Sequence, residues 1–255
     1  MAQIKDMNVG SFFDRLFRGS ASPEATAQTL KESRLHQRHR LQDFDLLTIS
    51  WKDGQALRLQ NLSYGGFALV QSMEKTSPDD LSIIAGTLHL QGEACPFKAK
   101  KVREDSGIFG FQFVHDTEET LKFLRPFLEN LRAGESMSAI DTAYLNAAFS
   151  SRYQVALRGD GPVDLFLENA TNGPLNFHMT FRNHKIYHEI RLRDQVLVTG
   201  RSFDEDGVAT RMLTDVSPDP LVLKQAMQIL VGALIQDGPH VASIKRVYEK
   251  LRGGC

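Results

Sequence analysis

The chain has 255 residues, enough for one large domain or two ordinary ones. Its hydrophobic content of 42% and charged content of 24% are those of a globular protein, and a formal net charge of −1 gives no support for general nucleic-acid or membrane binding. No apolar run reaches the roughly 20 residues that span a bilayer, no secretory signal is recognisable, and Cys95 and Cys255 lack the spacing of a metal site or a disulfide framework. We therefore expect a cytoplasmic protein with free thiols and no transmembrane segment.

Residues 1–32 are expected to form helices and a linker ahead of the first domain. Apolar residues recur there at helical spacing, namely Val9, Phe12, Phe13, Leu16 and Phe17. A helix with this face packs on its own protein, docks on a partner or rests on a membrane surface, and all three readings stay open. Ser22 and Pro23 then favour a second helix that reaches about Gln37.

From Asp45 the period of the apolar residues changes from helical toward two, which is typical of β-strands. Strands are expected at about residues 46–51, 56–62, 66–72, 82–91, 95–103 and 108–115. Turn signals such as Asp53-Gly54 separate them, and their spacing favours an antiparallel barrel or closed sheet. Helical spacing returns over about 117–132 and predicts a helix that covers one face of the barrel, with Pro126 as a point of kinking.

A domain boundary is expected at residues 133–136, which makes 33–135 the first domain and 136–255 the second. The second is expected to begin with a short helix over about 138–149. Strands follow at about residues 152–158, 163–169, 175–182, 185–192, 195–201 and 207–214. Pro218 and Pro220 precede an apolar helix over about 219–236, which is either buried in its domain or part of a homodimer interface, and a polar amphipathic helix closes the chain.

The chain is thus predicted to be mainly β with flanking helices. The N-terminal part is an antiparallel β-barrel with a closing helix, and an antiparallel α+β domain follows it.

Two short patterns carry the functional interpretation. Residues 61–66, with the sequence NLSYGG, lie between two expected strands and indicate a sharp turn, in which Asn and Ser bond nearby backbone and the glycines allow φ > 0 or close backbone approach. About 25 residues upstream, Arg34 and Arg38 stand at i and i+4. Taken separately, the turn is only a turn and the arginines are a solvated basic helix end.

Together, and in this order, the two patterns resemble the paired signature of the PilZ domain, Arg-x-x-x-Arg followed by Asp/Asn-x-Ser-x-x-Gly. Residues 107–114 (GIFGFQFV) and the helix at 117–131 resemble the late core strand and the closing helix of that family, so the resemblance covers residues 33–132. PilZ domains are bacterial receptors for cyclic di-GMP. The resemblance implies a ligand-binding set of Arg34, Arg38, Asn61, Ser63, Gly65 and Gly66, with Arg40 as a further contact.

Arginine suits this ligand because its planar fork bonds a phosphate or a guanine edge and its face stacks on a purine. The Asn61 amide supplies a donor and an acceptor, and Gly66, which lacks Cβ, lets the backbone approach. Arg40 is an alternative second arginine of the signature, although it would place His36 at the position of the first.

The resemblance implies a bacterial effector and not an enzyme. Cyclic di-GMP would act as a second messenger whose binding changes the domain arrangement and the contact with a protein partner, within the family's range of motility, adhesion, biofilm and development. The alternative is a PilZ-like scaffold that binds protein and not nucleotide.

Catalytic motifs such as Gly-x-Ser-x-Gly, His-Glu-x-x-His and a phosphate-binding loop are absent from the sequence, so we expect no catalytic residue, metal or cofactor. A third hypothesis is a metal-dependent or hydrolytic second domain that uses His178, His184 and Glu189. A hairpin over 175–192 would bring His178 near Glu189 and put His184 and His188 on one face. Exposed histidines on strand faces are the favoured account.

Overall fold

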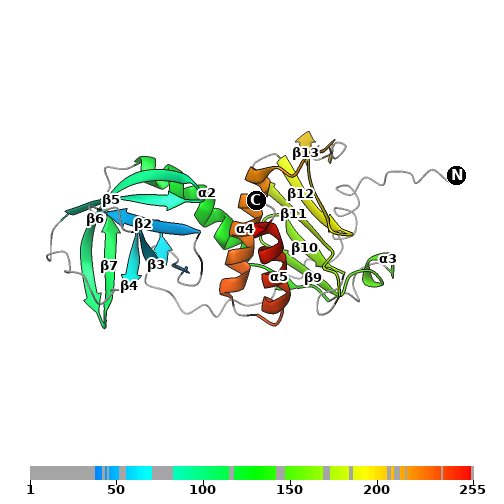
Figure 1. The fold of residues 1–255 in the computed structure, drawn as a ribbon, viewed down its shortest axis with the longest axis horizontal. Helices are drawn as coiled ribbons and strands as arrows, with labels where there is room; N and C mark the ends of the chain where they lie inside the picture. The colour runs from blue at the N-terminus through cyan, green and yellow to red at the C-terminus, as the bar shows by residue number, and fades with distance from the viewer. Residues whose placement is uncertain are drawn as a thin grey trace. The chain divides into compact units, whose positions relative to one another are not determined.

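The computed structural model describes residues 38–41, 44, 46–51, 56–70, 83–114, 118–141, 147–168, 173–183, 186–205, 208–209, 213–215, 217–236 and 238–253. The expected N-terminal helices, Arg34, the turn at 52–55 and His184 lie outside these residues. The described chain forms two compact units, one from Lys31–Arg132 and the other from Ala133–Leu234 with Gly238–Cys255. Both are built on antiparallel sheets, so the fold is mainly β, as predicted (Figure 1).

The first unit is a curled sheet whose path returns on itself. Its strands are β1 (His39–Arg40), β2 (Leu47–Trp51), β3 (Ala56–Ser63), β4 (Gly66–Val70), β5 (Ile83–Leu90), β6 (Glu93–Asp105) and β7 (Ile108–Phe113). They pair in the order β1-β3-β2-β5-β6-β7-β4. Strands β3 and β4 also pair with each other. This pairing closes an antiparallel ring of six strands in the order β3-β2-β5-β6-β7-β4.

Alternating apolar residues fill the inside of this ring. Phe67 stacks on Phe111 with ring centroids 5.0 Å apart and meets Phe97 edge-on at 5.3 Å. Helix α2 (Glu118–Glu135) buries Leu124, Phe127, Leu128 and Leu131 almost completely. The helix continues through Pro126, which is exposed, and the Thr120 hydroxyl donates to the Pro96 carbonyl at 3.2 Å.

The second unit is one broad sheet with helices on one side. Its elements are β8 (Ser138–Ala139), α3 (Ala147–Ser150), β9 (Val155–Gly159), β10 (Val163–Leu167), β11 (Phe177–Asn183), β12 (Ile186–Arg193), β13 (Val196–Glu205), β14 (Val208–Ala209), β15 (Leu213–Thr214), α4 (Pro220–Ile235) and α5 (Val241–Arg252). The strands follow one another in the order β14-β13-β12-β11-β10-β9-β8, and β15 also pairs with β13.

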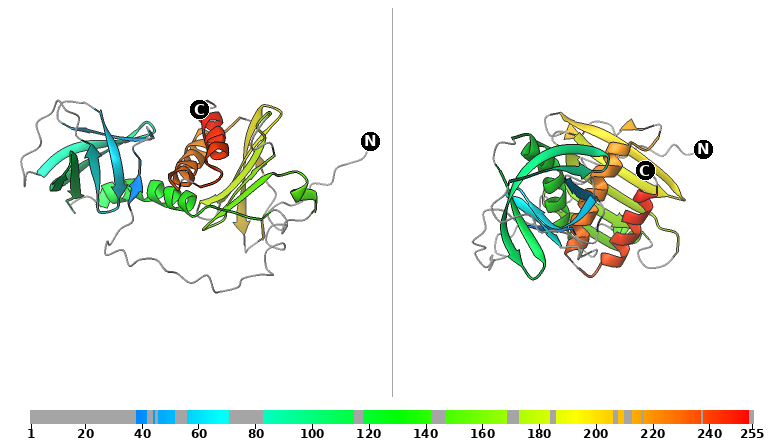
Figure 2. Two further views of the ribbon diagram at one scale, coloured as in Figure 1. Left: turned by 90° about the horizontal axis from the view of Figure 1, so that it is seen from below. Right: turned by 60° about the vertical axis from the view of Figure 1, so that its left-hand side comes forward.

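Helices α4 and α5 cover one face of this sheet (Figure 2). Leu165, Met179 and Ile190 point from neighbouring strands into a shared core with both helices. The apolar α4 is buried in its own unit, which is one of the two arrangements expected for it. Gly134, in the last turn of α2, lies against α4 so closely that a Cβ there would fall 1.8 Å from the Ile229 carbonyl oxygen.

Two local predictions for this unit were wrong. The short helix expected over 138–149 does not begin at Ser138, because Ser138 and Ala139 pair with β9 and the Ile140 N–H continues that ladder to the Ala156 carbonyl; the described helix is Ala147–Ser150. The strand expected over 207–214 is instead the two short strands β14 and β15. Their registers against β13 differ by one residue, so one uninterrupted ladder cannot form.

Candidate functional site

Strand β3, which carries Asn61 and Ser63, contains a β-bulge. Leu59 pairs with Leu69 of β4 and Asn61 pairs with Ala68, so Gln60 is the extra residue. Leu59 and Leu62 are therefore both buried although they are three residues apart. The intervening Gln60 and Asn61 are half-exposed, and the Asn61 amide donates to Gln60 Oε1 at 3.3 Å. The bulge thus turns Asn61 away from the core.

The arginine segment pairs directly with this bulged strand. Arg40 lies opposite Asn61, His39 lies opposite Leu62, and the Leu41 N–H donates to the Gln60 carbonyl at 2.9 Å. His39 is buried beside Leu62, whereas Arg40 is exposed, as is Arg38. Residues directly opposite each other in an antiparallel pair have Cβ atoms about 4.5–5.5 Å apart. The fold therefore brings Arg40 and Asn61 together on the outer face of the sheet.

The turn after Asn61 has structural reasons for its serine and glycines. The buried Ser63 hydroxyl donates to the Gly66 carbonyl at 3.2 Å, and the Gly65 carbonyl accepts from the Phe113 N–H at 3.0 Å. Neither glycine has a positive φ. A Cβ on Gly66 would lie 2.0 Å from the Phe111 carbonyl oxygen, so glycine is needed there for β4 to approach β7.

Helix α2 adds charged residues near this turn that the sequence analysis did not single out. The pKa of Tyr64 is raised, first by burial and then by the negative charge of Glu129, while Arg125 and Arg132 act in the opposite direction. The two arginines are seven residues apart and therefore share one side of the helix. Tertiary packing places these charges near the turn, and the spacing of the residues in the sequence does not reveal it.

A buried charged cluster lies in the second unit, on the sheet face opposite α4 and α5, hereafter the second face. The hairpin of β11 and β12 forms as predicted and brings His178 Nε2 within 2.6 Å of Glu189 Oε1. This contact is an ion pair only when the imidazole is protonated, and its alignment is poor for a hydrogen bond. Arg191 Nε lies 2.9 Å from the same oxygen. Burial by itself raises the pKa of Glu189, but the contacts with His178 and Arg191 lower it overall, so the carboxylate is ionised at neutral pH.

His188 belongs to the other face of this sheet, because neighbouring residues of a strand point to opposite sides. Its ring stacks on Phe181 at 5.2 Å, and burial lowers its pKa. His184 lies outside the described residues. Within the ranges that the structure describes, no three His, Cys, Asp or Glu side chains gather as a metal site.

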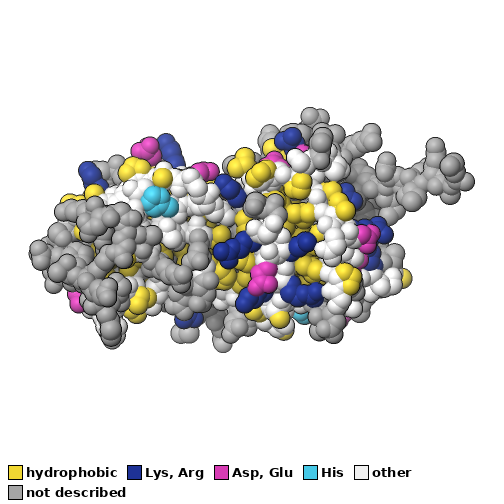
Figure 3. Space-filling model, viewed as in Figure 1, with side chains coloured by type: hydrophobic (Ala, Val, Ile, Leu, Met, Phe, Trp, Pro, Cys, Tyr) yellow, Lys and Arg dark blue, Asp and Glu magenta, His cyan; other side chains and the backbone are white. Residues whose placement is uncertain are grey.

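Helix α5 presents a basic surface in the second unit, and Figure 3 shows Lys and Arg side chains gathered over this region. The helix carries Lys245, Arg246, Lys250 and Arg252. Arg246 donates to the Gly173 carbonyl at 2.9 Å, and Lys250 donates to Gln195 Oε1 at 3.2 Å. Two of the four cations thus hold loops of their own unit, and cations in a last helical turn also suit the helix dipole.

Comparison with known proteins gives no family. No family model matches the sequence, and no curated protein matches it. A crystal structure of an uncharacterised Legionella protein is similar over 38% of this chain and 94% of that chain, with 14% identity and a TM-score of 0.31. Among the described residues, no helix combines the length and apolar character needed to cross a membrane.

Proposed function

We propose that the chain is a cytoplasmic effector that binds cyclic di-GMP on the outer face of its first unit. The observation that carries the proposal is the pairing of Arg40 with Asn61, since it joins the arginine segment to the residue that opens the Asn-x-Ser-x-x-Gly pattern across one strand pair. An exposed guanidinium and a half-exposed amide lie side by side there. Such a pair offers donors for a phosphate or guanine edge and an acceptor for a guanine N–H.

The charges around the pair support an anionic ligand. Arg38 and Arg40 are both exposed at the start of the sheet, and Arg125 and Arg132 of α2 influence the turn that follows Asn61. Cyclic di-GMP carries two phosphates, so several separate cations suit it better than one. In this arrangement Arg40 contacts the ligand beside Asn61, while Arg38 and Arg34 close over it.

Ser63 and Gly66 take a supporting role in the proposal. Their contacts with β4 and β7 fix the turn, and the turn fixes the outward direction of Asn61. Ligand binding then changes the arginine segment and, through it, the contact with a protein partner in second-messenger signalling. The alternative is a PilZ-like scaffold in which the same turn serves only the fold and the protein binds a partner without nucleotide.

Isothermal titration of the full-length chain with cyclic di-GMP tests the proposal. Arg40→Ala and Asn61→Ala should each weaken binding strongly, and Arg34→Ala and Arg38→Ala show which arginine completes the pair. Lys98→Ala is the matched control, because Lys98 is an exposed cation on β6 of the same sheet. Absence of saturable binding by the wild type would reject the receptor and favour the scaffold.

A further inference from the structure

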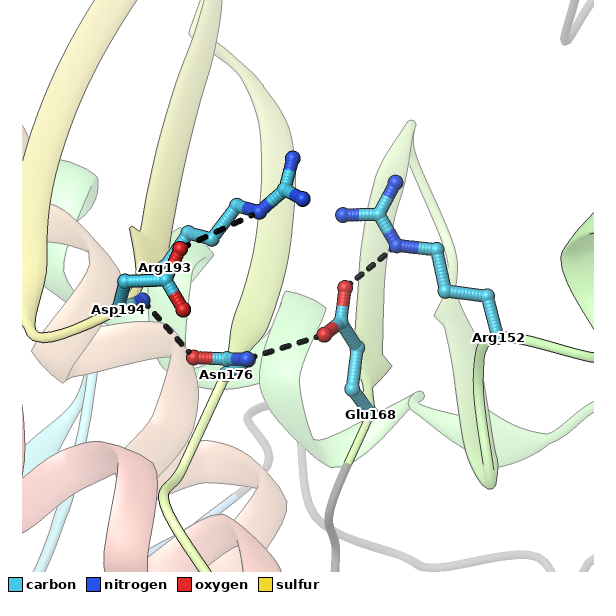
Figure 4. Close-up of polar contacts among 5 residues, drawn as sticks. All are labelled: Arg152, Glu168, Asn176, Arg193 and Asp194. Carbon is cyan, nitrogen blue, oxygen red and sulfur yellow. Dashed lines mark hydrogen bonds and ion pairs between the residues drawn. The ribbon is translucent and has the colours of Figure 1, made fainter.

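One end of the second face carries a polar cluster that the proposed function does not use (Figure 4). Arg152 precedes β9, Glu168 follows β10, Asn176 precedes β11, and Arg193 ends β12. Because the strands are antiparallel, these four positions lie at the same end of the sheet. Residues spread over more than forty positions of sequence therefore meet in one place.

Glu168 is held in a fixed position by two of these residues. Its Oε1 accepts from Arg152 Nε at 2.5 Å, and its Oε2 accepts from Asn176 Nδ2 at 3.1 Å. Asn176 Oδ1 in turn accepts from the Asp194 N–H at 3.2 Å. The guanidinium of Arg152 also lies over the ring of Tyr153, 5.2 Å from its centroid. The network thus connects Arg152 to the turn that carries Arg193.

The Glu168 carboxylate is influenced by both guanidinium groups, although only Arg152 hydrogen-bonds to it. Figure 4 shows Arg152 and Arg193 pointing toward one another beside Glu168. Burial alone raises the pKa of Glu168, but hydrogen bonds from Arg152 and Asn176 and the charges of both arginines lower it overall. The exposed Asp194 carboxylate is 3.7 Å from Arg193 Nε, too far for a hydrogen bond, so water screens it.

Both arginines keep donors available for a ligand. Their side chains are 49% and 72% exposed, and among the described residues nothing hydrogen-bonds to the terminal nitrogens of either guanidinium. Each arginine presents a planar fork that matches an oxyanion. Glu168 and Asp194 each contact one guanidinium through its Nε, so the outer edges of both forks can meet a further oxyanion.

The turn behind Arg193 is held in a costly conformation. Arg193 pairs with Val196, so Asp194 and Gln195 form a two-residue hairpin turn, and both have positive φ, 51° and 67°. Asn-Gly is the usual choice for such a turn because non-glycine residues are strained there. The chain has Asp-Gln instead, and Lys250 fixes the Gln195 side chain. The backbone that carries Arg193 is therefore held by the turn.

We propose that Arg152 and Arg193 form a clamp for the phosphate group of a small phosphorylated ligand, with Glu168 and Asn176 as positioning residues. The clamp lies in the second unit and is independent of the cyclic di-GMP proposal. Its affinity comes from charge-assisted hydrogen bonds made by the two forks, of which that of Arg152 is already oriented by Glu168.

Titration of the full-length protein with pyrophosphate at constant ionic strength tests the clamp. Binding is monitored by calorimetry and by the arginine Nε–H signals in ¹⁵N spectra. Pyrophosphate should bind saturably and shift the signals of Arg152 and Arg193. Arg152→Ala and Arg193→Ala should each weaken binding roughly ten- to hundredfold. Arg182→Ala, which removes an exposed arginine from the same face, should leave the affinity unchanged.

Arg152→Lys and Arg193→Lys keep the charge and serve if an alanine variant does not fold; they should also bind more weakly, because an ammonium lacks the fork. Unchanged affinity in all four clamp variants, or no saturable binding by the wild type, would overturn the clamp. Equal affinity for succinate would overturn its assignment to phosphate. Pyrophosphate binding that survives Arg40→Ala with Asn61→Ala supports a site separate from the cyclic di-GMP site, whatever the outcome there.

Discussion

Glu189→Gln is expected to destabilise the second unit by about 2–4 kcal/mol. Removing one partner of a buried ion pair costs about 3–5 kcal/mol, because the other charge is left without compensation. The Glu189 side chain is 3% exposed, but its cationic partner Arg191 is 49% exposed and can be hydrated instead, so the cost extends below that range. Glutamine keeps the size of the side chain and removes only its charge.

Urea unfolding followed by circular dichroism at pH 7 measures this effect. The matched control is Glu118→Gln, which removes an exposed carboxylate paired with Lys122 at 2.9 Å and should cost about 0.5 kcal/mol or less. Equal stability of the Glu189→Gln variant and the wild type at pH 7 would refute the reasoning.

The same pair of proteins tests the pH dependence. The pKa of Glu189 is lowered in the folded chain, so its stabilisation is complete above the unfolded value of about 4.3 and is lost as the pH falls through the folded value. The gap in unfolding free energy between wild type and variant should therefore narrow in acid. A gap that stays constant from pH 7 down to the acid limit of the folded state would contradict the assignment of the stabilisation to an ionised Glu189.

Three packing predictions follow from close approaches. Gly66→Ala should lower the free energy of unfolding of the first unit by about 3 kcal/mol or more, measured with denaturant, since its Cβ would meet the Phe111 carbonyl at 2.0 Å. The control is Gly92→Ala, whose Cβ meets nothing within 4 Å. It should cost only the roughly 1–2 kcal/mol of a left-handed backbone conformation. Gly134→Ala should lower the melting temperature of the second unit, whereas Gly238→Ala in open space should not. Phe97→Ala should cost about 3–5 kcal/mol, measured in the same way, because the side chain is buried against Phe67 and Phe113.

The sequence predicted strands well where period-two alternation is bounded by turn residues, as in β11 and β12. It failed over 138–149, where pairing with β9 decides the structure of residues 138–139 and a local helical preference does not. The bulge at Gln60 was also missed, because one extra residue in a strand leaves almost no trace in the alternation. The period of the apolar residues and the turn signals indicate the fold class, whereas such details depend on which strands meet.

The candidate sites likewise divide into contacts that local sequence patterns predict and contacts that depend on which strands pair. The closeness of His178 to Glu189 was predictable because a hairpin has one simple register. The choice between Arg38 and Arg40 was not, because it depends on how β1 pairs with a bulged strand, and there Arg40 is the residue opposite Asn61. The Arg152–Arg193 cluster has no sequence signal at all, since only the strand order brings its members together.

The short strand β1 also protects a sheet edge. Residues 56–58 of β3 pair with β2, and residues 61–62 of β3 pair with β1 beyond the end of β2. Strand β4 pairs along the opposite edge of β3. Withdrawal of His39 and Arg40 would leave the amide and carbonyl groups of that edge without partners, and an extended segment of another chain could then add to it as a strand. Movement of two residues would be enough to convert a paired strand edge into one that can bind another strand.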